Sequence, residues 1–253
     1  MPSPTPPTVL LGPRSLIYVG PLGRGLPHTH AANVALVALD RPLLLRLSGG
    51  GWIEHGSALI PAGTRHELDP QQARFAVVYA DIHAPCWQAM QPGQNLLSEL
   101  PHSTALRNCL IEVAESAAWI PALEHQLATS LMASLGTPST ARSRLQIALD
   151  DYLQPSADLT LDGLAAHMQL STRRVQHLFL KELGVSYKRV QHWVRFRGAI
   201  QAMGQWGTLT DAALEGGFSD SSHFSNAFRS MFGVSARGAG ILQGSFRLWT
   251  TPW

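Results

Sequence analysis

The tetrapeptide Leu183-Gly-Val-Ser186 returns as Phe232-Gly-Val-Ser235, 49 positions further along the 253-residue chain. Each copy closes a stretch in which the apolar spacing predicts an amphipathic helix, a short turn and a second helix. Two copies of one helix-turn-helix pattern predict an all-α domain built on an internal repeat.

In the first copy, Thr160 and Ser171 are placed to cap the two helices, since their side-chain oxygens can accept from unpaired backbone N–H groups. Gly184 suits the left-handed end of the second helix. Val175 and Phe179 mark the apolar side of that helix. The opposite side is polar, cationic and free of acids, with Thr172, Arg173, Arg174, Gln176, His177 and Lys181.

In the second copy, Leu209–Phe218 gives a weaker first helix and Ser219-Asp220 opens the next. Its apolar side carries Phe224, Ala227, Phe228 and Phe232, and its polar side carries Ser221, Ser222, His223, Ser225, Asn226 and Arg229. A longer helix from Ser186 to about Gln205 joins the copies. Two such helices can enter successive major grooves about 34 Å apart. One copy alone could equally be a solvated helix face, but the repeat favours DNA binding.

The charge distribution agrees with this interpretation. Residues 142–253 hold 12 Lys and Arg against 8 Asp and Glu, whereas residues 1–141 hold 7 against 9. The second half therefore suits a polyanionic partner, although the asymmetry is small.

The first half is predicted to be β-rich. Short apolar runs at 15–19, 33–39, 43–47, 58–60 and 75–79 are separated by Gly- and Pro-containing turns, which is typical of a sandwich or small barrel. From about Asn95 the spacing becomes helical, and Gly136–Ser143 reads as a linker. The predicted domains are residues 1–138 and 139–253.

The repeat resembles the AraC/XylS family of transcription regulators. Gly217–Ser235 looks like the signature of that family, and Leu170–Ser186 followed by Arg195–Ala199 resembles the preceding half, so the match spans about residues 142–240. Four positions depart from it. Tyr187 and Ala236 stand where Pro is usual, Gly216 replaces a bulkier apolar residue, and Gly198 lies inside the connecting helix. Because an interior Gly costs up to about 1 kcal/mol relative to Ala, the second unit is predicted to be looser.

The resemblance implies a two-domain fold, with an N-terminal all-β cupin-like barrel, appended helices, and a C-terminal all-α domain of two helix-turn-helix units joined by a long helix. It implies a sequence-specific DNA-binding regulator, usually an activator, with double-stranded DNA, RNA polymerase and a second copy of the chain as partners. Together with helix geometry, it predicts base reading by Arg173, Gln176, His177, Ser222, His223 and Asn226. The predicted phosphate contacts are Thr172, Arg174, Lys181, Ser221 and Arg229.

Two segments of the first half are similar to the histidine-bearing cupin motifs. These are His28-Thr-His30 and Gly56–His66, the latter with a Pro-x-Gly-x-x-His ending. A small-molecule effector is predicted in the mouth of the barrel, lined by His28, His30, Trp52, His66 and Tyr79. The three histidines could instead hold a divalent metal, although the usual carboxylate of the first motif is missing. Structural histidines are the third interpretation, and no cofactor is certain.

The helix expected at Pro121–Leu135 carries Leu123, Leu127, Leu131 and Leu135 on a stripe touched by Met132. This stripe predicts either a dimer contact or packing on the chain's own barrel. No apolar run approaches the ~20 residues of a membrane span, and no signal peptide is visible, so a cytoplasmic protein is expected. The alternative function is a metal-dependent cupin enzyme whose helical domain is an interaction module. That alternative leaves the repeat unexplained.

Overall fold

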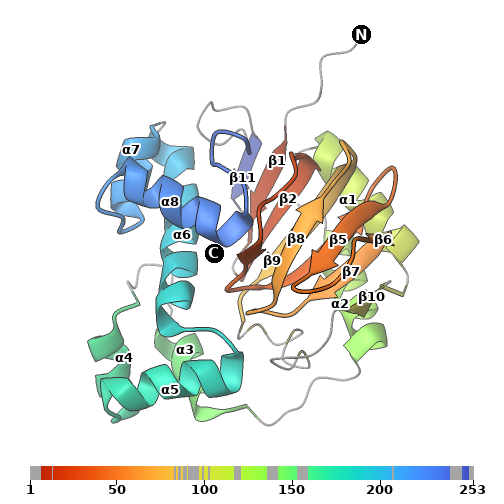
Figure 1. The fold of residues 1–253 in the computed structure, drawn as a ribbon. Coiled ribbons are helices and arrows are strands. Elements are labelled where there is room, and N and C mark those ends of the chain that lie inside the picture. Colours follow the sequence, from red (N-terminus) through yellow and green to blue (C-terminus); the bar gives the residue numbers. More distant parts are fainter. Residues whose placement is uncertain are drawn as a thin grey trace.

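The computed structural model describes residues 7–12, 14–82, 84, 87, 90, 97–98, 100–101, 103–116, 121–135, 142–152, 159–206, 208–239 and 247–250. A β-rich part lies beside a helical part (Figure 1). The predicted order, β-rich first and helical second, is confirmed. The predicted boundary at residue 138 lies outside the described residues.

The β-rich part consists of two sheets. The larger has the strand order β10 (Leu97–Ser98), β7 (Ser57–Ile60), β4 (Asn33–Ala38), β9 (Arg74–Ala80), β2 (Ser15–Pro21), β1 (Thr8–Leu11) and β11 (Arg247–Thr250). The smaller has the order β3 (His28–Thr29), β8 (Arg65–Asp69), β5 (Leu43–Leu47) and β6 (Ile53–His55). The chain passes several times from one sheet to the other, and among the described residues no strand of one sheet pairs with a strand of the other. The predicted barrel is therefore corrected to two facing sheets.

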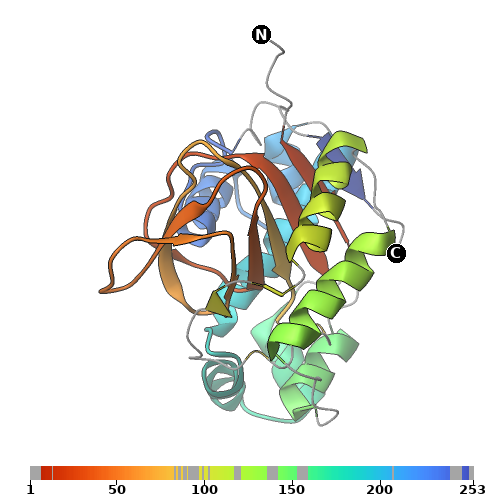
Figure 2. The ribbon, with the colours of Figure 1, turned by 90° about the vertical axis from the view of Figure 1, so that its right-hand side faces the viewer.

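The larger sheet is covered on both faces. Helices α1 (Ser103–Ser116) and α2 (Pro121–Leu135) lie across one face (Figure 2), where they pack on alternate strand residues such as Ile17, Ala35 and Val78. The other face packs against the smaller sheet and the helical part. Burial on both sides explains why β4 and β9 are nearly continuous apolar runs rather than alternating ones.

The leucine stripe of α2 faces its own sheet. Leu123 and Leu131 have no exposed surface, and Leu127 and Leu135 pack against the same apolar cluster. Met132 is 46% exposed. Leu123 and Leu131 therefore serve packing within the chain, which supports the second of the two predicted roles, while the dimer contact stays a prediction.

The helical part contains α3 (Arg144–Tyr152), α4 (Leu161–Met168), α5 (Thr172–Leu183), α6 (Tyr187–Trp206), α7 (Leu209–Glu215) and α8 (Ser221–Phe232). Thr160 and Ser171 accept hydrogen bonds from the N–H groups of Gly163 and Arg174, and Gly184 has φ 68°. The predicted caps are thus confirmed. With 20 residues, α6 is about 30 Å long and holds the two units apart by nearly one turn of DNA.

Gly198 and Gly216 allow α6 and α7 to approach closely. A Cβ on Gly216 would lie 2.7 Å from both the Arg195 carbonyl oxygen and the Ala199 Cβ, while a Cβ on Gly198 would lie 3.7 Å from the Gly216 Cα. Close packing is therefore the structural reason for Gly216, a reason that helix propensity did not reveal.

The two parts share a continuous apolar core and several polar contacts. Asp81, which follows β9, accepts from Trp193 Nε1 at 2.7 Å and pairs with Arg197 at 2.5 Å. Strand β11 returns to the β-rich part and pairs in parallel with β1. That tail had no predicted role. No described helix is long and apolar enough to cross a membrane.

Candidate DNA-binding surface and interdomain histidine site

Helix α5 presents the predicted base-reading side chains to solvent. Arg173, Gln176 and His177 are exposed, while Val175 and Phe179 on the opposite side are fully buried. The Ser171 cap and the Gly184 end hold this helix in place. Arg174 and Lys181 are also exposed and Thr172 is half-buried, so a cationic helix face is available to DNA.

Helix α8 presents a less charged face. Ser222, Asn226 and Arg229 are exposed, and Ser221 is half-buried. Asp220 caps the helix by accepting from the His223 N–H at 2.7 Å, and this hydrogen bond lowers the pKa of the Asp220 carboxyl. A carboxylate thus stands at the start of α8, and its negative charge would repel a DNA phosphate at this end of the helix.

His223 is engaged within the chain. Its Nδ1 lies 3.2 Å from Ser219 Oγ, and its ring packs edge-on against Phe218 and His192 at centroid distances of 5.3 and 5.9 Å. Because the Ser219 contact uses His223 Nδ1, base reading by this residue would have to use Nε2.

His28, His30 and His66, here called the histidine cluster, meet between the two parts of the molecule. His28 in β3 lies directly across from His66 in β8, and His30 follows β3 on the same side. Their ring centroids are 4.3 to 4.8 Å apart. Each ring offers one nitrogen, and these three atoms lie within 4.8 Å of one another. The sequence prediction that both motifs share one site agrees with this placement.

Hydrogen bonds define how two of the rings are protonated. His28 Nδ1 lies 2.8 Å from the Leu26 carbonyl oxygen, and His66 Nδ1 lies 2.9 Å from that of Thr64. Because a carbonyl can only accept, each Nδ1 carries the proton and each Nε2 keeps its lone pair. His28 Nε2 lies 3.2 Å from His30 Nε2. His30 Nδ1 is buried and makes no hydrogen bond to the described residues.

Burial keeps the three imidazoles neutral. It lowers the pKa of His28 and of His30, and it lowers the pKa of His66 to about 3. For His30 the neighbouring His28 and His66 lower the pKa further, while the main-chain carbonyl of Met231 in α8 acts in the opposite direction. Neutral imidazoles have lone pairs available for a ligand.

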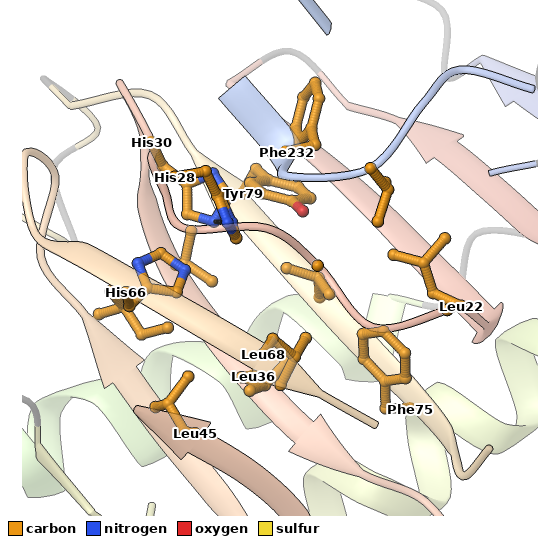
Figure 3. A pocket seen from close by; sticks show the side chains of 16 residues that line it. Leu22, His28, His30, Leu36, Leu45, His66, Leu68, Phe75, Tyr79 and Phe232 are labelled. Carbon is orange, nitrogen blue, oxygen red and sulfur yellow. Dashed lines mark hydrogen bonds between the residues drawn. The ribbon is translucent and has the colours of Figure 1, made fainter. Parts of the chain in front are cut away.

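The cavity beside the cluster is small, with a volume of about 20 Å³. Apolar side chains such as Leu36, Leu68 and Phe75 line the end away from the histidines (Figure 3). Tyr79 and Phe232 close it on the helical side, with ring centroids 5.2 Å apart. Trp52 lies elsewhere, where the guanidinium carbons of Arg24 and Arg46 are 4.9 and 4.7 Å from its ring centroid. Trp52 is therefore not among the residues that line the cavity, contrary to the prediction.

The C-terminal end of α8 lies directly on the cluster. The Gly233 carbonyl accepts from the Leu26 N–H at 2.8 Å, and a Cβ on Gly233 would lie 2.5 Å from His28 Nδ1. Gly233 has φ 73°, so both its conformation and its surroundings favour glycine. The repeat places Gly233 at the position equivalent to Gly184, but no local pattern could show that it meets His28.

A larger open groove of about 520 Å³ lies on the β-rich part near α1. Asp40, Arg41, Ser57, Thr104 and Arg107 are among the residues that line it. Its size is in the range of small-molecule pockets. The sequence motifs did not point to it.

Two helix-turn-helix units on one connecting helix are docked on a β-rich part, which is the architecture that the sequence resemblance implied. Residues 164–238 match the model of a helix-turn-helix domain family, which is of the AraC type. The resemblance to AraC/XylS regulators drawn from the repeat is thereby confirmed.

The whole fold is similar to crystal structures of ToxT from Vibrio cholerae. ToxT from strain O395 has 12% sequence identity and a TM-score of 0.59, with 94% of this chain and 97% of that chain covered. Wild-type ToxT bound to an unsaturated fatty acid, from strain SCE256, has 12% identity and a TM-score of 0.60, with 92% and 98% covered. At such identity the likeness concerns the fold. No curated protein matches the chain in sequence.

Proposed function

We propose that this chain regulates transcription by placing α5 and α8 in successive major grooves of one DNA site. The observation that carries the proposal is the exposed cationic face of α5, joined to α8 by a helix about 30 Å long. Arg173, Gln176 and His177 would read bases, with a smaller contribution from Ser222 and Asn226. Arg174, Lys181 and Arg229 would contact phosphates.

The β-rich domain would receive the signal. Its histidine cluster touches the end of α8, so a ligand bound there acts on the second helix-turn-helix unit without any further link. Pockets for organic ligands usually have volumes of about 300 Å³ or more, whereas this cavity has about 20 Å³. Such an effector would need the interface to open, or would use the groove near α1. The fatty acid bound to ToxT makes a small organic acid one candidate.

The remaining parts of the proposal concern partners and place. A regulator of this class acts in the cytoplasm as a homodimer, contacts RNA polymerase and catalyses no reaction. Because Leu123 and Leu131 of α2 are used internally, a dimer contact on this helix would have to use its other side chains, among them Met132. A cupin enzyme is disfavoured because it would leave the helix-turn-helix repeat unexplained.

Selection of bound sequences from a random duplex pool tests the proposal. We expect two short half-sites about one helical turn apart, with the stronger preference at the half-site bound by α5. With Arg174, Lys181 and Arg229 on phosphates, the logarithm of the binding constant should fall with the logarithm of salt concentration with a slope of about −3. Absence of sequence preference together with salt-independent binding would contradict the proposal.

A further inference from the structure

We infer that the histidine cluster binds one divalent transition-metal ion of the zinc class, and that this ion acts on the DNA-binding domain through the C-terminal end of α8. The inference deepens the proposed function, on which it rests, by naming the signal. Three neutral imidazole nitrogens suit zinc, nickel, cobalt or copper rather than magnesium or calcium, which prefer oxygen ligands.

The geometry of the nitrogens fits an ion. Two nitrogens bound to a tetrahedral ion at 2.0–2.1 Å lie about 3.3 Å apart, and His28 Nε2 and His30 Nε2 are 3.2 Å apart. The third nitrogen lies within 4.8 Å of the others, so His66 has to turn inward to complete the set. The cavity of about 20 Å³ holds roughly one water molecule, which is the size of a fourth ligand.

The surroundings of the rings already resemble a second coordination shell. A metal-bound histidine usually donates its other N–H to a carbonyl or carboxylate. His28 and His66 do so to Leu26 and Thr64. His30 differs, because its Nδ1 is buried without a hydrogen bond in the described residues. An ion on Nε2 would place the His30 proton on Nδ1, with the Met231 carbonyl close to that ring.

The charges near the site have mixed signs. The C-terminal end of α8 carries partial negative charge from carbonyls without partners in the helix, and this favours a cation. Glu67 also favours positive charge on the cluster, whereas Arg65 and Arg189 oppose it. The Arg189 guanidinium donates to the Thr29 carbonyl at 2.9 Å, so its positive charge lies near the cluster and works against a cation there. The bonds to nitrogen therefore have to supply most of the affinity.

The coupling to DNA follows from what the ion would touch. Met231, Phe232 and Gly233 end the second recognition helix, and all three lie beside the cluster. A proton on His30 Nδ1 that is donated to Met231 adds a hydrogen bond between the domains. The ion would thus hold the end of α8 more firmly against the β-rich domain.

The metal-binding test uses the untagged full-length chain after chelator treatment, titrated with Zn²⁺ or Co²⁺ alone. We expect about one ion per chain, and a visible Co²⁺ spectrum of four-coordinate type. Changing an outer-shell partner typically costs 10–100-fold in affinity, so loss of a ligand in His30→Gln or His66→Gln should weaken binding by about 100-fold or more. The matched control, His125→Gln on the exposed side of α2, should bind like wild type. The inference would be overturned if the wild type bound the ion only weakly, or if both cluster variants bound it as tightly as the wild type.

The coupling is tested by hydrogen exchange at residues 221–235 with and without Zn²⁺. Slower exchange is expected in the wild type and in His125→Gln, with no change in His66→Gln. A stoichiometric ion that leaves this exchange unaltered would remove the link to α8. Duplex binding by the metal-free protein is measured separately, so that its absence refutes the proposed regulator while the metal result stands by itself.

Discussion

The two recognition helices share a local sequence pattern but have different surroundings. Helix α5 carries exposed Arg173, Gln176 and His177 on one side and packs by the other. Helix α8 carries shorter side chains, begins at a carboxylate and ends against the histidine cluster. The first unit is thus suited to reading bases, and the second is placed where the β-rich domain can act on it.

This difference shows that the two copies of an internal repeat can be suited to different roles. Both helices have N-caps, left-handed glycine ends and buried apolar sides. What separates them is the domain that lies at the end of α8. Three sets of substitutions test this difference between the two units.

The largest effect is expected for Asp81→Ala. This change leaves Arg197 buried beside the interface without its carboxylate and removes the acceptor of Trp193 Nε1. Loss of one partner of a buried pair costs about 3–5 kcal/mol, which denaturant unfolding would measure.

The matched control is Arg14→Ala, which breaks another ion pair between the same two parts. Arg14 lies 2.7 Å from Asp150, but its side chain is 43% exposed, so the cost should be about 0–1 kcal/mol. If both variants lose equal stability, docking does not depend on the buried pair.

Gly216→Ala should destabilise the second unit selectively. The new Cβ would lie 2.7 Å from the Arg195 carbonyl oxygen, and such overpacking costs about 1–3 kcal/mol. Gly198→Ala is the control, because its Cβ has ordinary contact distances and gains up to about 1 kcal/mol of helix propensity. A stabilised Gly216→Ala protein would show that α6 and α7 can separate at no cost.

Arg173→Ala tests base reading by the first unit. We expect a loss of about 1–3 kcal/mol on the selected site and a relaxed preference at one base position. Asn226→Ala at the second unit should cost less, about 0.5–1.5 kcal/mol for one hydrogen bond. A base-by-base binding profile of each variant measures both.

Lys181→Ala provides the contrast for Arg173→Ala. It should weaken specific and nonspecific binding alike and reduce the salt slope by about one. If Arg173→Ala instead weakens all sequences equally, Arg173 contacts phosphate and the assignment of base reading to α5 is wrong.

The local features of the helical domain could be predicted from sequence. The caps at Thr160 and Ser171, the glycine end at Gly184 and the buried side of α5 each depend on residues within one or two helical turns. The pairing of His28 with His66 was also predictable, because two motifs indicated neighbouring strands. The arrangement of the strands in two separate sheets, the choice between the two roles of the α2 leucines and the position of Trp52 could not be predicted, since each depends on segments far apart in the chain.

Sequence alone was sufficient for the repeat, its capping and its cationic face, because helix formation and side-chain exposure on a short helix follow from local spacing. Only the tertiary structure brings Gly233 and Met231 to the histidine cluster, pairs Asp81 with Arg197 and returns β11 to β1. These contacts join residues more than a hundred positions apart. They form because the two domains bury one continuous apolar core between them, and that shared burial determines which end of which helix meets the sensor.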